Sequence, residues 1–269
     1  MKTMNRALIF NIAALLAAAD VPAQDWAKAR LEKSPRHLEW VKVKHGKREV
    51  NSFLAFPEAK DKATAVVVIH EIFGLTDWVR GVADQLAEAG YIAIAPDLLY
   101  GTGPNGEGTS ELGGSDGVRK AISSLPPYQI TADLTAEVEF VSKLPACNGK
   151  VIVAGFCWGG SQSFRFATNN KNIRAALVFY GSGPPEERDM ARINCPVYGF
   201  YGGNDARVTS TISESADLMK KAGKAYEPVT YEGAGHGFMR AGEAPDASEA
   251  NKKAHDQAWR RWKVILKRL

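Results

Sequence analysis

The chain has 269 residues, of which 45% are apolar, and its net charge at pH 7 is +4. This apolar fraction is enough for a large core, and the length allows one domain or two. The basic residues are scattered, without a stripe of Lys and Arg interleaved with aromatics, so the sequence argues against nucleic acid as a partner.

Residues 1–23 have the composition of a secretory signal peptide. Lys2 and Arg6 form a positive region, residues 7–19 are apolar, and a small-residue cleavage site ends at Ala23. We therefore expect a periplasmic or secreted protein, cleaved near this alanine and without a stable membrane anchor. An uncleaved anchor is the alternative, although the apolar stretch is short for a membrane span.

After the leader, residues 24–39 are polar, and we expect them to form a loosely attached N-terminal arm. A single domain is predicted over residues 40–269. It begins with two segments, 40–44 and 50–56, in which apolar and polar residues alternate. The turn-forming residues between them predict an antiparallel hairpin.

The rest of the domain alternates predicted strands with predicted helices. Apolar runs typical of buried strands occupy 65–69, 91–95, 151–153, 175–180, 197–201 and 228–231. Helical spacing is found near 76–89, 130–144, 161–168, 210–221 and 251–269. Short connections between these elements indicate an α/β fold with a mostly parallel central sheet and helices on both faces. On the last helix, His255 is expected at the surface.

Residues 101–128 interrupt this alternation with a glycine-rich segment. Over the first half of this segment, apolar residues show neither the helical spacing nor the alternation of a strand. A long segment of this kind inside a compact domain is typical of a functional loop. We expect a mobile loop or a short-helix cap over a site.

Residues 151–160, with the sequence VIVAGFCWGG, predict a strand, a sharp turn and the start of a helix, with Cys157 at the tip. This is the form of the G-x-S-x-G nucleophile elbow, with sulfur in place of oxygen. Glycines flank such a turn because it is strained and neighbouring backbones come close. The alternative is a buried structural cysteine on a strand-to-helix turn.

Three further polar residues follow other predicted strands: Glu71, Asp205 and His236. Ligands of parallel sheets bind outside the carboxyl ends of the strands, so these residues should converge on Cys157. The order nucleophile, acid, histidine is that of α/β-hydrolases. We predict that Cys157 attacks an acyl carbon, that His236 holds the thiolate and later serves the hydrolytic water, and that Asp205 fixes the imidazole tautomer.

Two backbone N–H groups are predicted to form an oxyanion hole. One belongs to Trp158, at the start of the helix after the elbow, and the other to Ile72, in the loop after the first parallel strand. Glu71 then lies beside the site, where it can accept the thiol proton or pair with a positive charge. The alternatives are a structural, salt-bridged Glu71 and a loop-capping Asp205.

The chain has three cysteines, Cys147, Cys157 and Cys195. An odd count in an oxidising compartment suggests one free thiol and one pair. Cys157 is the candidate free thiol. The other two each precede a predicted strand at the amino-terminal edge of the sheet, so we hypothesise a disulfide between Cys147 and Cys195.

Four motifs together resemble the dienelactone hydrolase (carboxymethylenebutenolidase) family. They are His70–Gly74 (HEIFG), Gly155–Gly160 (GFCWGG), Asn204-Asp205 and Gly235–Phe238 (GHGF). The resemblance covers residues 40–268. It implies an α/β-hydrolase fold, a Cys-His-Asp triad, and hydrolysis of an enol-lactone ring without a metal or an organic cofactor.

The resemblance also implies roles outside the triad. Glu71 would take the proton of Cys157 when substrate arrives, and arginines would bind a substrate carboxylate. Arg240 matches one of these arginines by its place after the histidine, and Arg119 is a candidate for another. Gly237, where the family often has serine, and the glycine-rich cap depart from the family pattern.

The leading hypothesis is therefore a hydrolase of lactone or carboxylic ester bonds that forms an acyl-cysteine. Its partner would be a small-molecule lactone or ester, with or without a carboxylate, and the protein is expected to be a monomer. One alternative is a broad-specificity carboxylesterase or thioesterase on the same triad. The other is a non-catalytic binding protein on a hydrolase scaffold, which would have no need of a thiol beside a base.

Overall fold

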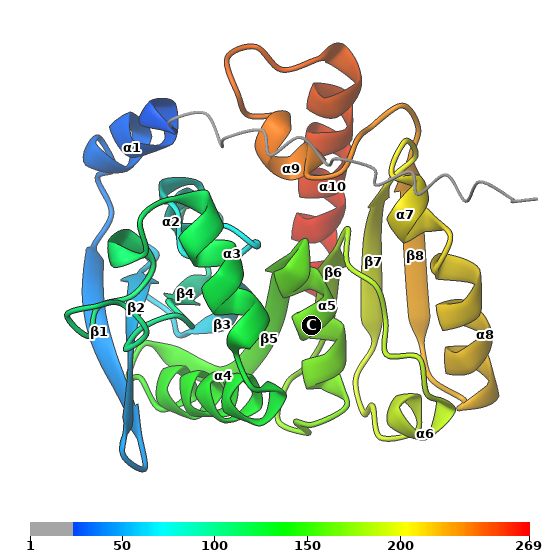
Figure 1. Cartoon of the computed structure of the whole chain (residues 1–269), viewed down its shortest axis with the longest axis horizontal. Helices are drawn as coiled ribbons and strands as arrows, with labels where there is room; N and C mark the ends of the chain where they lie inside the picture. Colours follow the sequence, from blue (N-terminus) through cyan, green and yellow to red (C-terminus); the bar gives the residue numbers. More distant parts are fainter. Residues whose placement is uncertain (1–23) are drawn as a thin grey trace, which may run out of the picture.

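The computed structural model describes residues 24–269, so the predicted signal peptide lies outside the described residues. One eight-stranded sheet runs through the domain in the order β1-β2-β4-β3-β5-β6-β7-β8 (Figure 1). The pairs β1/β2 and β2/β4 are antiparallel, and the remaining neighbours are parallel. The predicted hairpin and the mostly parallel α/β sheet are confirmed.

The strands are β1 (Leu38–His45), β2 (Arg48–Ala55), β3 (Ala63–Ile69), β4 (Ile92–Pro96), β5 (Cys147–Phe156), β6 (Ala176–Phe179), β7 (Val197–Gly202) and β8 (Tyr226–Tyr231). The α-helices are α1 (Asp25–Glu32), α2 (Asp77–Glu88), α3 (Ser115–Ser124), α4 (Pro127–Ser142), α5 (Trp158–Ala167), α6 (Glu187–Met190), α7 (Ala206–Thr209), α8 (Ile212–Lys221), α9 (Phe238–Ala241) and α10 (Glu249–Arg268). Within the described range, no helix is long and apolar enough to cross a bilayer.

Helices cover both faces of the sheet because its central strands are apolar on both sides. In β3, Val66 and Val68 point into one core, while Val67 and Ile69 point into the other. The first core is covered by α1, α2, α9 and α10, and the second by α3, α4, α5 and α8. The carboxyl ends of the parallel strands are left for loops, which carry the candidate site.

The N-terminal arm is not loosely attached, in contrast to the prediction. It forms α1, whose Ala27 is fully buried, and α1 lies against α2 (Figure 1). The following residues are fixed by a two-pronged contact, in which Arg36 Nε and Nη2 donate to Asp84 on α2 at 2.6 and 2.7 Å. The arm also makes apolar contacts, because Trp26 and Leu31 pack against the first core.

The cap segment forms short helices, which is one of the two forms predicted for it. A 3₁₀ turn at Thr109–Glu111 is followed by α3, which buries Val118 and Ile122, one helical turn apart. The turn is tied to the end of β4, because Asp97 accepts the backbone N–H and the hydroxyl of Thr109, both at 2.8 Å. The cap is therefore anchored at its base.

A buried carboxyl between α4 and β2 gives the stability of the protein an expected pH dependence. Glu137 has no exposed surface, and the Ser52 hydroxyl donates to it at 2.7 Å. Burial, with a smaller contribution from the charge of Asp133, raises the pKa of Glu137 from 4.5 to about 8. The unfolded chain loses this proton near pH 4.5 and the folded chain keeps it to about pH 8, so stability falls as the pH rises through that interval.

Replacing Glu137 with glutamine should remove this loss. We expect the gain in free energy of unfolding of Glu137→Gln over the wild type to be a few kcal/mol larger at pH 8 than at pH 4.5, measured by urea unfolding at both values. Glu139→Gln, on the exposed side of the same helix, is the control and should change little. A gain of equal size at both pH values would contradict the assignment.

Candidate active site

Cys157 stands at the junction of β5 and α5, in a backbone conformation that few residues adopt. Its φ is 56° and its ψ is −116°. The turn requires the glycines around it, since a Cβ on Gly155 would lie 1.9 Å from the carbonyl oxygen of Gly159. A Cβ on Gly159 would lie 2.3 Å from the carbonyl oxygen of His70. The elbow thus holds the thiol at the carboxyl edge of the sheet.

The predicted triad partners follow later strands at the same edge. Asp205 comes after β7, and His236 lies in the loop after β8. His236 Nδ1 lies 2.5 Å from Asp205 Oδ2, and the carboxylate is nearly buried, with 6% of its side chain exposed. A proton on Nδ1 satisfies this carboxylate and leaves Nε2 as the basic atom of the imidazole. This is the geometry that a triad acid and base require.

The electrostatic surroundings of Cys157 keep its thiol protonated at rest. Burial, and then the negative charge of Glu71, raise its pKa to about 11. The backbone N–H groups of Trp158 and Ile72 act in the opposite direction, because they favour a negative sulfur. These are the two groups predicted to form the oxyanion hole, so the structure brings both of them to the sulfur.

Glu71 and Arg240 form an ion pair beside the thiol. Arg240 Nε donates to Glu71 Oε2 at 2.7 Å, and only 2% of the Glu71 side chain is exposed. The guanidinium groups of Arg240 and Arg119 both lie over the ring of Phe73, at 5.3 and 5.4 Å from its centroid. Arg119 of the cap and Arg240 of α9 therefore pack on the same aromatic ring.

Tyr180, which follows β6, is a site residue that the sequence analysis missed. Its φ is 42°, which is uncommon for a bulky residue, and its ring packs against His236 with centroids 5.1 Å apart. The hydroxyl is buried and has no hydrogen-bond partner among the described residues. The sequence did indicate this residue, since Tyr180-Gly181 lies at the end of a predicted strand, at the same edge of the sheet as Cys157.

The predicted disulfide between Cys147 and Cys195 is wrong, because both thiols are free. Strand β6 separates β5 from β7, which places the two cysteines two strand spacings apart, or roughly 9.5 Å. Val153 and Val197 both align with Ala176, and the cysteines precede these valines by six and two residues. An irregularity between Cys147 and Val151 takes up two of these residues, so the offset along the strands is about two residues, or roughly 7 Å. The strand spacing alone already exceeds the limit of about 7 Å between the Cα atoms of a disulfide.

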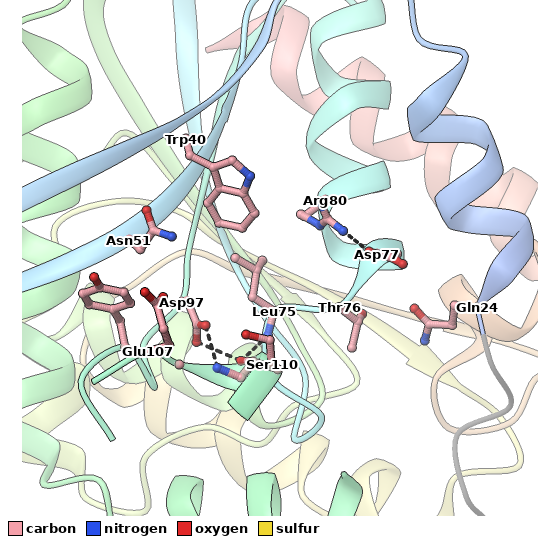
Figure 2. A pocket seen from close by; sticks show the side chains of 13 residues that line it. Gln24, Trp40, Asn51, Leu75, Thr76, Asp77, Arg80, Asp97, Glu107 and Ser110 are labelled. Carbon is pink, nitrogen blue, oxygen red and sulfur yellow. Dashed lines mark hydrogen bonds and ion pairs between the residues drawn. The ribbon is translucent and has the colours of Figure 1, made fainter. Parts of the chain in front are cut away.

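A separate hollow of about 450 Å³ opens between β1 and the cap (Figure 2). Trp40, Leu75 and Tyr100 form its apolar wall, and Arg80 and Asp97 are among its polar residues. None of the predicted catalytic side chains lines it. The convergence of Glu71, Cys157, Asp205 and His236, and not the size of a cavity, therefore locates the candidate active site.

The chain is similar to known proteins over most of its length. Residues 50–269 match the model of the dienelactone hydrolase family. The "Putative carboxymethylenebutenolidase" of Salmonella typhimurium is 33% identical over 231 residues, which cover 80% of this chain and 82% of that protein.

Two solved structures are similar to the fold. The "Putative Dienelactone Hydrolase" of Klebsiella pneumoniae has a TM-score of 0.76 at 24% identity and covers 87% of this chain and 99% of its own. A dienelactone hydrolase-like promiscuous phosphotriesterase from metagenomic libraries has a TM-score of 0.73 at 22% identity, with coverage of 87% and 98%. At these identities the structures support the fold alone.

Proposed function

The chain belongs to the dienelactone hydrolase family and is a lactone or ester hydrolase, and we propose that it works through an acyl-cysteine on Cys157. The observation that carries this proposal is the Arg240–Glu71 pair of 2.7 Å beside a thiol whose pKa is raised to about 11. Such a thiol is unreactive until a base reaches it. The base beside it is held by an arginine that a substrate carboxylate can take over.

Substrate entry then switches the partners of Arg240. A carboxylate on the substrate binds Arg240, and Glu71 is released to accept the proton of Cys157. The thiolate attacks the carbonyl carbon, and the backbone N–H groups of Trp158 and Ile72 stabilise the resulting oxyanion. The ring C–O bond breaks, and the departing oxygen receives the proton that came from the thiol.

Water completes the reaction. His236, held by Asp205 through the 2.5 Å contact, takes a proton from water, and the hydroxide attacks the thioester carbon. The C–S bond breaks, the acid product leaves, and His236 returns the proton from water to the sulfur. Arg119, over the same Phe73 ring as Arg240, is placed to add a second positive charge for the substrate carboxylate.

Mass spectrometry of the intact protein tests the proposal. Incubation with a carboxylate-bearing enol lactone should add the full mass of the lactone to the mature chain, and peptide mapping should place it on Cys157. Aryl esters run in parallel separate a lactone hydrolase from a broad esterase. Turnover of the lactone with an acyl group on serine, or with no covalent species under rapid quench, would contradict the acyl-cysteine.

A further inference from the structure

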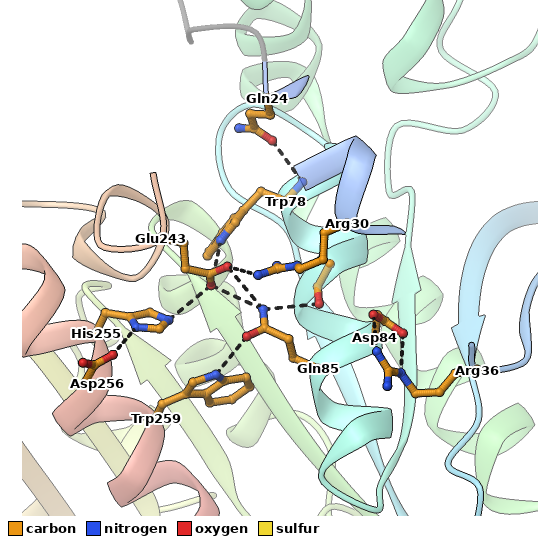
Figure 3. Close-up of polar contacts among 11 residues, drawn as sticks. Gln24, Arg30, Arg36, Trp78, Asp84, Gln85, Glu243, His255, Asp256 and Trp259 are labelled. Carbon is orange, nitrogen blue, oxygen red and sulfur yellow. Dashed lines mark hydrogen bonds and ion pairs between the residues drawn. The ribbon is translucent and has the colours of Figure 1, made fainter. Parts of the chain in front are cut away.

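Glu243, immediately after α9 and its capping residue Gly242, is a buried carboxylate that joins several elements (Figure 3). Only 6% of its side chain is exposed. Arg30 Nη1 of α1 donates to it at 2.6 Å, and Trp78 Nε1 and Gln85 Nε2 of α2 donate at 3.3 Å. His255 Nε2 of α10 lies 3.3 Å from it, as an ion-pair contact and not at the surface as predicted. We call these five residues the Glu243 cluster.

The charges of the cluster keep Glu243 ionised. Burial alone would raise its pKa, but the contacts with His255 and Arg30 outweigh burial and leave the pKa below its ordinary value. An ionised carboxylate in a buried place is costly unless its partners stay in position. The loop that carries Glu243 is therefore held firmly at this end.

The other end of the same short segment is the candidate active site. His236 lies two residues before α9 and is tied to Asp205, while Arg240 lies within α9 and is tied to Glu71. The backbone N–H of Glu243 donates to the carbonyl of Arg240 at 3.2 Å. A single turn of helix has little stability of its own, so its position depends on these end contacts.

The guanidinium of Arg30 lies close to a glycine in the middle of α2. A Cβ on Gly81 would lie 2.8 Å from Arg30 Nη2, so a side chain at this position would shift the guanidinium. Glycine is otherwise unfavourable inside a helix. Arg30 and α1 also lie outside the part of the chain that matches the family, which begins at residue 50.

We infer that Arg30, acting through Glu243, positions Arg240 for the carboxylate of the substrate. α1 is then a positioning element of the active site, contributed by a segment that precedes the family match. This inference rests on the proposed function, because Arg240 is the group whose position is being set. Arg30 and Glu243 are positioning residues, and neither touches the reacting atoms.

Steady-state kinetics on two substrates test the inference. Arg30→Met should raise KM for a carboxylate-bearing enol lactone about tenfold, with kcat and the hydrolysis of neutral 4-nitrophenyl acetate within about twofold. Gly81→Ala, which keeps every charge but displaces the guanidinium, should raise the same KM. Arg30→Lys, which keeps the positive charge, should restore KM to within about threefold.

Arg36→Met is the matched control, because it removes a charge from the same segment and breaks a contact with α2 that does not reach α9 (Figure 3). It should leave both KM values unchanged. Hydrogen exchange adds a readout without substrate: amides of residues 238–243 should exchange faster in Arg30→Met than in Arg36→Met.

Three results would overturn the inference: equal effects on both substrates in Arg30→Met, the same KM change in Arg36→Met, or unchanged exchange in residues 238–243. If the wild-type protein hydrolyses neither substrate, the proposed function fails, and the exchange experiment still decides whether Arg30 holds α9.

Discussion

Cys157→Ala is expected to lower the hydrolysis of activated esters and lactones by roughly 10⁴-fold or more, because no other group on the proposed path can form the acyl intermediate. The fold should be retained. The substitution removes only the sulfur, from a side chain that is partly exposed, and alanine meets the same backbone geometry. Initial rates give the first result, and far-UV circular dichroism with thermal unfolding gives the second.

Cys195→Ala is the matched control for this variant. Burial raises the pKa of Cys195 to about 11, the value also reached by Cys157, but Cys195 lies before β7, at the opposite edge of the sheet. Its turnover should stay within about twofold of wild type. Undiminished hydrolysis by Cys157→Ala would refute the nucleophile assignment and would favour a different group or a directly activated water.

Glu71→Gln is expected to move two properties of the site in opposite directions. The Glu71 charge contributes to the raised pKa of Cys157, second only to burial, so its removal should lower that pKa. Alkylation by iodoacetamide at pH 8 should therefore become faster, since the thiolate is the reactive form. Hydrolysis should nevertheless become slower by about 10²-fold, because the base that takes the thiol proton is lost.

The pH dependence supplies the internal check on this variant. With a pKa of about 11, the wild-type alkylation rate should rise about tenfold for each pH unit between 7 and 10. The curve for Glu71→Gln should lie at lower pH. Glu232→Gln, an exposed change in the loop that leads to His236, should alter neither rate. A parallel fall in alkylation and hydrolysis would show that Glu71 only supports the structure.

The parallel sheet and the elbow were predictable because each depends on residues that are close in sequence. The side chains of residues 65–69 alternate between two cores, and the glycines around Cys157 act over a few residues. Because the strands are parallel, Asp205 and His236 then lie at the same edge of the sheet as Cys157. Crossover connections between parallel strands are right-handed, and the connections here are short, so few other topologies fit this pattern of strands and helices.

The misses involve contacts between residues that are far apart in sequence. The N-terminal arm was predicted to be loose because the partners of Arg36 and Arg30, which are Asp84 and Glu243, lie about 50 and 200 residues away. His255 was placed at the surface because nothing in the helical pattern of residues 251–269 indicates an ion pair with Glu243 on the preceding loop. Ion pairs of this kind leave no periodic signal, since a single charged residue on each element is enough.

The disulfide was wrong for a different reason. Two cysteines that each precede a strand say nothing about which strand lies between them, and β6 intervenes here. Strand order is a property of the whole sheet. Tyr180 was missed because an aromatic residue at a strand end is usually part of the core. Its positive φ and its packing against His236 are visible only in the structure.

The raised pKa of Cys157 also bears on how long the enzyme lasts. At pH 7 a thiol with a pKa of about 11 is ionised in roughly one molecule in 10⁴, against about one in a hundred or more for an ordinary cysteine. Peroxides and disulfides react with the thiolate, so the idle enzyme presents them with almost no target. If the leader sends the protein to an oxidising compartment, a nucleophile that ionises only with substrate bound would be shielded from sulfenic acid formation between turnovers.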